Sequence, residues 1–333
     1  MNCVLRWLTK RILKGILTIY VAVTITFFLI RAMPTNPIDR ALQEYLRQGI
    51  PEAEARSMVA SVFAMFDISK PISEQYVSYI SGLLRGDLGR SIYYLNVPVV
   101  EIIGPAVTWT VFLLSLSLVT SFLIGILIGV AMAYLRGSSF DSIAGGICTF
   151  CNAIPNYILA LFLLFYLAYG LRLFPTYGAH DIWITPGFTW EFISSVLHHS
   201  FLPFLAYVVT SFGGWGLTMR GSTVSVLGED YVVAAEARGL SKRRVMLSYV
   251  GRNAILPLFT SFTISLGFIF GGSTLIETYF SYPGVGWYLM FSINRRDYVL
   301  MQAFFLIITV AVVLSNLLTD ILYGMLDPRI KAE

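Results

Sequence analysis

Charged residues are scarce in this 333-residue sequence. Asp, Glu, Lys and Arg make up only 13% of it, whereas hydrophobic residues make up 56%, and the mean hydropathy is +0.73. A globular protein needs about a quarter of its residues charged to cover its surface, so this composition excludes a soluble chain. It also excludes a disordered chain, because disorder requires low hydrophobicity and high net charge, and the net charge here is only +4.

Residues that carry redox, metal or nucleotide chemistry are also few. Three cysteines cannot form a disulfide framework in a chain of this length. Cys148 and Cys151 form a C-x-x-C inside an apolar run, where a thiolate is costly, and the three histidines lie in no metal-binding spacing. No lysine follows a glycine, so the P-loop that binds ATP is missing. We expect no catalytic residue, metal or cofactor in this chain, and the lack of a basic stripe argues against a nucleic-acid partner.

Six stretches without Asp, Glu, Lys or Arg are each long enough to cross a bilayer once, which takes about 20 mainly apolar residues. The first stretch is short, but Lys14 and Arg31 at its ends can reach the headgroups. The second exceeds one crossing, so we place its span at 107–134. The six stretches are 15–30, 102–135, 142–171, 192–219, 253–276 and 298–319. The sequence therefore predicts an all-α integral membrane protein with six transmembrane helices.

The N-terminus is predicted to be cytoplasmic, because cytoplasmic segments are enriched in Lys and Arg. Arg6, Lys10, Arg11 and Lys14 precede the first span. No small-x-small cleavage site follows this span, so we interpret it as an uncleaved anchor rather than a signal peptide. Six spans return the C-terminus to the cytoplasm and place a second basic cluster, within 220–252, on the same side. The two basic clusters therefore favour the same orientation.

The segment between the first two spans is too long for a simple loop and predicts a small helical cap outside the membrane. Apolar residues recur at helical spacing from Ile38 to Leu46, Gly49 can end that helix, and Pro51 and Pro71 can each begin another. We divide the chain into a cytoplasmic N-terminus with the first span (1–32), an extracellular helical cap (33–106), a five-span core (107–323) with a cytoplasmic loop (220–253), and a cytoplasmic tail (324–333).

Small and polar residues within the spans predict close packing and one kink. Gly125 and Gly129 are four residues apart, a spacing that lets a neighbouring helix approach closely. Pro155 lies between Asn152 and Asn156, where it should free a carbonyl and kink the third span. Polar groups at such a break either face a water-filled path or hydrogen-bond to other helices, and the sequence leaves both interpretations open.

The most unusual segment reads Gly-Glu-Asp-Tyr-Val-Val-Ala-Ala-Glu-Ala-Arg-Gly-Leu-Ser from 228 to 241. It predicts a short helix with Asp230 near its start and Gly239 at its C-terminal stop. One side of this helix is expected to present Tyr231, Ala234, Ala235 and Arg238. A surface of small residues does little for the helix itself but suits a knob that inserts into a cleft of another protein. A solvated loop helix is the alternative.

The stretch 230–245, followed by Arg-Asn-Ala-Ile-Leu-Pro at 252–257, closely resembles the EAA loop of ABC importer permeases. The eighteen-residue step from Gly239 to Pro257 is similar to the dipeptide, oligopeptide and nickel subfamily rather than to sugar permeases of the maltose type. Val233 stands where the motif's name would place Glu, a departure that this subfamily commonly shows. Further similarity to the subfamily lies at 82–91, 276–286, 296–300 and 326–329.

The resemblance implies a type I ABC importer permease in the plasma (inner) membrane, which passes solute inward by alternating access. It implies four kinds of partner: a homologous second permease, two ATP-binding subunits that hold ATP and Mg, an extracellular substrate-binding protein and membrane lipid. The 33–106 cap and the 277–297 loop would receive the binding protein, and the helix 229–240 would transmit ATPase closure. The residues expected to couple to the ATPases are Glu229, Asp230, Tyr231, Ala234, Ala235, Arg238 and Gly239. The candidate pore residues are Asn152, Asn156, Thr263 and Ser273.

The resemblance favours peptides as the substrate and leaves oligosaccharides and nickel chelates open. From a different class, the alternative is a channel that works without an ATPase, or a membrane enzyme. The chain has no P-loop and no evident acidic relay within its spans, so neither ATP hydrolysis nor a proton pathway of its own can drive uptake. We therefore expect the energy for transport to come from partner subunits.

Overall fold

The computed structural model describes residues 2–32, 37–62, 71–94, 97–269 and 274–326. Within these ranges the secondary structure is helical, apart from one isolated antiparallel pairing of Arg90 with Pro98. The helices are α1 (Asn2–Arg31), α2 (Pro37–Arg47), α3 (Glu52–Val62), α4 (Ile72–Leu84), α5 (Val99–Tyr134), α6 (Ser139–Ala153), α7 (Asn156–Leu163), α8 (Trp190–Leu227), α9 (Asp230–Ala237), α10 (Lys242–Arg244), α11 (Arg252–Phe268), α12 (Thr274–Tyr279), α13 (Val285–Arg295) and α14 (Tyr298–Leu326). Two π-helical segments, η2 (Leu164–Gly170) and η3 (Val245–Gly251), follow α7 and precede α11.

Four of the described helices are long and apolar enough to cross a membrane. They contain the segments Thr9–Ile30, Val99–Tyr134, Trp190–Leu227 and Tyr298–Leu317. The pair formed by α6 and α7–η2 gives a fifth candidate if it is counted as one bent span. The remaining predicted span, 253–276, contains all of the 17-residue α11 except Arg252 and then enters residues 270–273, which lie outside the described ranges. The structure thus supports an all-helical protein with four to five candidate spans.

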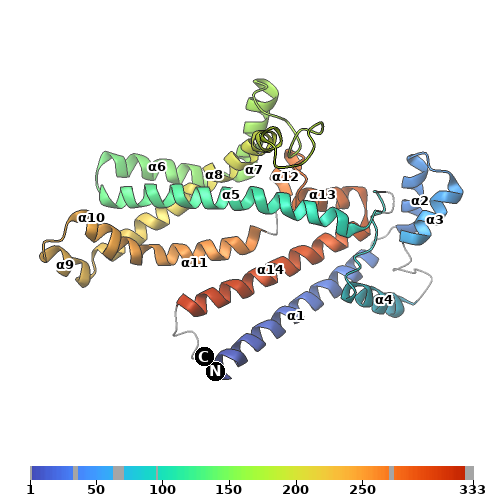
Figure 1. The fold of residues 1–333 in the computed structure, drawn as a ribbon, viewed down its shortest axis with the longest axis horizontal. Helices are drawn as coiled ribbons and strands as arrows, with labels where there is room; N and C mark the ends of the chain where they lie inside the picture. The colour runs from blue at the N-terminus through green and yellow to red at the C-terminus, as the bar shows by residue number, and fades with distance from the viewer. Residues whose placement is uncertain (1, 33–36, 63–70, 95–96, 270–273, 327–333) are drawn as a thin grey trace.

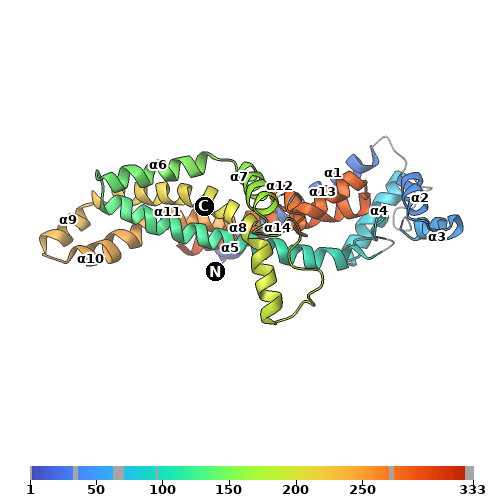
Figure 2. The ribbon, with the colours of Figure 1, turned by 90° about the horizontal axis from the view of Figure 1, so that it is seen from above.

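The long helices lie side by side along the length of the molecule (Figure 1). α8 packs against α5 and α6, α1 runs antiparallel to α14, and α11 contacts both α8 and α14. One end carries α9 and α10, and the opposite end carries α2, α3, α4 and α13. α7 stands across the long axis in Figure 1, and the first turns of α8 do so in Figure 2.

Glycines allow α5, α6 and α8 to pack closely. A Cβ atom on Gly129 of α5 would lie 2.5 Å from the carbonyl oxygen of Gly216 and 2.6 Å from the Cβ of Met219, both on α8. Gly213 of α8 lies directly against the backbone of Cys148 in α6. The close packing predicted around Gly129 is confirmed, and Cys148 is a small buried side chain at the contact between α6 and α8.

The third predicted span is not one kinked helix. α6 ends at Ala153, Ile154 and Pro155 are extended, and α7 starts at Asn156, with the two helices at 90° to each other. Proline cannot donate a backbone hydrogen bond and disfavours a helical conformation in the residue before it. Because both residues leave the helical region, the break is a full change of direction, larger than the predicted kink.

The three cap helices form where their sequence patterns predict them. Gly49 follows α2 with φ of +83°, a conformation that glycine adopts without strain. The cap packs on the first span, because the rings of Tyr79 in α4 and Phe27 in α1 stack with centroids 5.4 Å apart. The hydroxyls of Thr24 and Tyr76 also hydrogen-bond at 2.6 Å. The cap is therefore joined to α1 by buried contacts.

Candidate translocation cavity and coupling loop

A cavity of about 590 Å³ opens between α5, α8, α11 and the break between α6 and α7. Its lining mixes hydroxyls, amides and apolar side chains, and no charged residue belongs to it within the described part of the chain. The lining residues are Leu114, Ser117, Leu118, Ser121, Asn152, Asn156, Tyr207, Thr210, Ser211, Gly214, Trp215, Thr218, Ser261, Ser265 and Ile269. Such a surface can form hydrogen bonds with a solute but no ion pairs.

Two of the four predicted pore residues line this cavity. Asn152 at the end of α6 and Asn156 at the start of α7 reach it from the two sides of the proline break. Thr263 is buried and does not belong to the lining, and its hydroxyl donates to the carbonyl oxygen of Phe259 at 2.9 Å. Ser273 lies outside the described residues.

Serines that the sequence analysis did not select contribute much of the polar lining. Ser117 and Ser121 on α5 are one helical turn apart, as are Ser261 and Ser265 on α11. Each serine hydroxyl donates its proton to a carbonyl of its own helix, at 2.7 to 3.1 Å. Their oxygen atoms remain available as acceptors. A serine pair spaced by four residues in an apolar helix is the signal that could have revealed them.

The short helix α9 is held to the chain by a small apolar core of its own. Val232 and Ala235 are only 1% and 3% exposed and pack against Val245 and Val250 of η3. After α9, Gly239 takes φ of +74°, and its amide donates to the carbonyl of Glu236. The amide of Leu240 donates to the carbonyl of Ala235. These two bonds form a glycine stop of the Schellman type, at the position that the sequence predicted.

The structure separates the predicted coupling residues into two groups. Ala235 faces the loop's own core, which corrects its assignment to the outward side of the helix. The other six residues are exposed or partly exposed: Glu229, Asp230, Tyr231, Ala234, Arg238 and Gly239. The Tyr231 hydroxyl accepts a hydrogen bond from the Asn253 amide at 2.9 Å, which ties α9 to the start of α11. This bond is a direct contact between α9 and α11.

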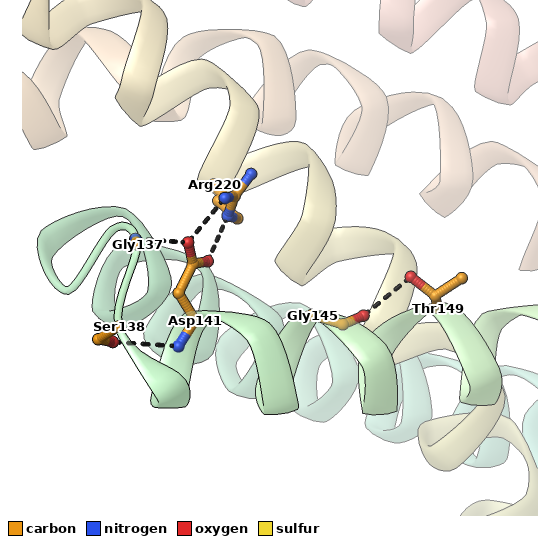
Figure 3. Close-up of polar contacts among 6 residues, drawn as sticks. All are labelled: Gly137, Ser138, Asp141, Gly145, Thr149 and Arg220. Atoms are coloured by element: carbon orange, nitrogen blue, oxygen red, sulfur yellow. Dashed lines mark hydrogen bonds and ion pairs between the residues drawn. The ribbon is translucent and has the colours of Figure 1, made fainter.

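An ion pair that the sequence analysis did not identify joins α6 and α8 near the α9 end (Figure 3). Arg220 Nε and Nη2 donate to the two carboxylate oxygens of Asp141 at 2.6 and 2.8 Å. The backbone amide of Gly137 also donates to Asp141, and Ser138 caps α6 by accepting from the Asp141 amide. A bidentate pair fixes both the distance and the orientation of the two side chains. It holds α6 against the end of α8, which leads into α9.

Two acidic residues of the 277–297 loop are buried rather than presented at its surface. Glu277 accepts from the Thr110 hydroxyl at 2.9 Å and from the Gly286 amide at 2.7 Å. Asp297, 1% exposed, accepts from the Ser91 hydroxyl at 2.5 Å and from the amides of Tyr93 and Leu300. These bonds tie the 277–297 loop to α5 and to the end of the cap, so the segments are one structural unit.

We expect Asp297→Asn to destabilise this unit. Burial raises the pKa of the Asp297 carboxyl, and hydrogen-bond donors on several sides act in the opposite direction. Asparagine would place an NH2 group, which can only donate, among those donors, and a buried donor that loses its acceptor costs about 1–3 kcal/mol. The midpoint of thermal unfolding of the purified protein should fall by roughly 5 °C. The exposed control Asp39→Asn should leave the midpoint unchanged, and equal midpoints for both variants would contradict this role.

Comparison with family models identifies the chain. Residues 125–332 match the model described as "Binding-protein-dependent transport system inner membrane component". Residues 4–102 match the model for the N-terminal part of such a membrane component. The chain belongs to this family. As an inner membrane component with several apolar helices, it is a multi-pass protein of the inner membrane.

Similar permeases align along almost the whole chain. The dipeptide transport system permease protein of Escherichia coli (strain K12) is 31% identical over 348 residues. The oligopeptide transport system permease protein of Bacillus subtilis (strain 168) is 30% identical over 330 residues. The glutathione transport system permease protein of Salmonella choleraesuis (strain SC-B67) is 31% identical over 327 residues. Each alignment covers 98% of this chain and 99% of the relative. The chain is thus a permease of a binding-protein-dependent transport system.

Proposed function

We propose that this permease imports peptides by alternating access, as one subunit of an ATP-driven transporter. The observation that carries the proposal is the similarity along the whole chain to permeases named for dipeptide, oligopeptide and glutathione transport. The cavity supports it, because uncharged hydroxyls and amides can hydrogen-bond to the backbone of a peptide without selecting for one particular side chain. Asn152 and Asn156 form the translocation path together with the serines of α5 and α11.

The transporter also contains a homologous second permease, two ATP-binding subunits and an extracellular binding protein. ATP and Mg belong to the ATP-binding subunits. The exposed side of α9, with Tyr231, Ala234 and Arg238, inserts into a cleft of one of them. The 33–106 cap and the 277–297 loop receive the loaded binding protein as one body, since Asp297 and Ser91 join them.

We propose six spans, with both termini in the cytoplasm, the cap outside and the loop 220–253 inside. The crossing that brings the five candidates to six is 253–276, the fifth in chain order, and it starts within α11. Ser61 in the cap and Ser241 in the loop are both exposed, so each can carry a reporter. After removal of the native cysteines, an impermeant thiol reagent should label Ser61→Cys from outside a sealed cell and Ser241→Cys only after permeabilisation. Labelling of both positions from outside would contradict this topology.

The proposed function is tested by purification and reconstitution. An affinity-tagged copy expressed with its neighbouring genes should carry a second permease and two ATP-binding subunits. Proteoliposomes of this complex should take up di- and oligopeptides when ATP and the binding protein are present. Replacement of the P-loop lysines in both ATP-binding subunits should abolish uptake.

The alternatives give different results in the same assay. ATP-dependent uptake of oligosaccharides but not peptides would keep the importer and change the substrate. Flux of solute down a gradient through the isolated chain, with neither ATP nor binding protein, would support a channel and contradict the importer.

A further inference from the structure

A groove of about 260 Å³ lies between α1 and α14, on the half of the molecule that carries both termini (Figure 1). Most of its lining is aliphatic. The two helices approach closely where Gly15 faces Val313, because a Cβ on Gly15 would lie 2.8 Å from the Cγ1 atom of Val313. On α1 the lining runs from Arg11 to Ile19, a length of about 12 Å at the helical rise. The groove is separate from the translocation cavity.

Polar groups gather at one end of this groove. Arg11 and Lys14 line it from α1, one turn apart, and Asn316 lines it from α14. Since the helices are antiparallel and Gly15 faces Val313, Asn316 lies about one turn toward the basic end, near the level of Arg11. Within the described part of the chain, the exposed Asn316 amide has no hydrogen-bond partner. This exposed amide can therefore donate to a ligand in the groove.

The chemistry of the groove defines its occupant as an anionic amphiphile. Two cations and an amide donor suit a phosphate and its ester oxygens, and the aliphatic part suits an acyl chain. Basic pockets between transmembrane helices bind anionic lipid headgroups in this way. The Arg11 guanidinium also lies over the Trp7 ring, 5.5 Å from its centroid, and tryptophan is enriched at the level of the headgroups.

We propose that this groove binds one anionic phospholipid, with its phosphate between Arg11 and Lys14 and with Asn316 donating to a phosphate or glycerol-ester oxygen. An acyl chain then covers the aliphatic lining along α1 and α14. In the orientation proposed above, the lipid comes from the cytoplasmic leaflet. The bound lipid bridges the first span and the last one, and the transported solute does not bind at this site.

Arg6 and Lys10 provide a matched control, because they precede the same span but do not line the groove. General attraction to an anionic surface acts on all four basic residues, whereas binding in the groove depends on Arg11 and Lys14. The variants Arg11→Gln/Lys14→Gln and Arg6→Gln/Lys10→Gln each remove two charges from one helix end. They therefore separate the site from its general electrostatic background.

The test uses the assembled transporter in detergent with phosphatidylglycerol and phosphatidylcholine in equal amounts. Native mass spectrometry counts the lipid retained on the complex. The wild type should retain phosphatidylglycerol in preference to phosphatidylcholine. Arg11→Gln/Lys14→Gln should lower retention at least about tenfold, and Arg6→Gln/Lys10→Gln should change it by less than about twofold. Equal losses in the two double variants, or no preference in the wild type, would overturn the site.

Two further measurements keep the proposal testable in two cases. In the first, the double variant fails to assemble, and in the second, protein rather than lipid fills the groove. Asn316→Leu keeps every charge and removes only the amide, so it should lower retention about fivefold, the effect of losing one hydrogen bond. Unchanged retention in this variant would overturn the proposal. A photocrosslinker at position 316 should attach to phospholipid in the assembled transporter. Attachment to a partner polypeptide instead would show that protein covers the groove and would also overturn it.

Discussion

Gly129→Leu is expected to prevent stable folding of the permease. A Cβ atom on Gly129 would already lie 2.5 Å from the carbonyl oxygen of Gly216, and leucine adds three more carbon atoms in that direction. The obstructing atom belongs to the backbone of α8, so it cannot rotate away as a side chain would. Overpacking of a close-packed interior costs about 1–3 kcal/mol for much smaller additions. The expected effect of leucine is larger than that.

The surroundings of Gly129 leave α8 little freedom to retreat from α5. On a neighbouring face α8 meets α6, where Gly213 lies against the backbone of Cys148. Close to the same level, Arg220 holds Asp141 of α6 through two hydrogen bonds. A shift of α8 away from α5 would therefore compress one contact or break the ion pair, so the strain cannot be relieved locally.

Gly146→Leu is the matched control for this prediction. Gly146 is also a helical glycine, but no atom lies within 4 Å of the position of its Cβ. Leucine is also a better helix former than glycine, by up to about 1 kcal/mol. In size-exclusion chromatography of fluorescent fusions, Gly146→Leu should elute as one sharp peak and Gly129→Leu as aggregate. A sharp peak for Gly129→Leu would show that the close packing of α5 and α8 is not required.

The sequence predicted local structure well where one periodicity determined it. The cap helices follow the spacing of apolar residues, with Gly49 and Gly239 as stops, because a positive φ favours glycine wherever it occurs. Long charge-free runs identify apolar spans, since the bilayer imposes a length. These are properties of single segments, and they require no knowledge of neighbouring helices.

Features that depend on a neighbouring segment escaped prediction. The right-angle turn at Pro155 depends on what α7 packs against after the break, and the cavity depends on how four helices come together. Helical geometry predicted Ala235 on the outward side of the helix, together with Tyr231, Ala234 and Arg238. Its inward direction is set by Val245 and Val250, which return to α9 only after the turn at Gly239. Helical spacing identifies which residues share a face but not what that face meets.

The inward position of Ala235 determines which residue tests coupling to the ATPase. An acidic residue at 235 would enter the apolar core of the loop and disrupt the loop itself, so loss of transport would not report on a partner. Ala234 is the neighbouring small residue that is exposed. A substitution at 234 therefore alters the surface that faces the partner and leaves the apolar core of the loop intact.

Ala234→Glu is therefore expected to abolish uptake while the permease still folds. Glutamate at 234 lies four residues before Arg238, and this order of charges stabilises an isolated helix slightly. Local folding of α9 is thus preserved, and the cost falls on the interface. A bulky charge in a packed contact costs on the order of 2 kcal/mol or more, which corresponds to at least about thirtyfold weaker binding. The permease should insert normally and lose the ATP-binding subunits during purification.

Val233→Glu is the matched control, because it adds the same side chain at an exposed residue on another side of the same helix. The EAA loop that this segment resembles places Glu at this position by name, so the variant should keep ATP-driven uptake close to that of the wild type. Both variants add the same charged side chain at an exposed position of α9. A difference in uptake between them therefore shows that one particular side of the helix contacts the partner. Equal uptake by both, at equal levels of inserted protein, would mean that α9 is a solvated loop helix and that coupling runs through another surface.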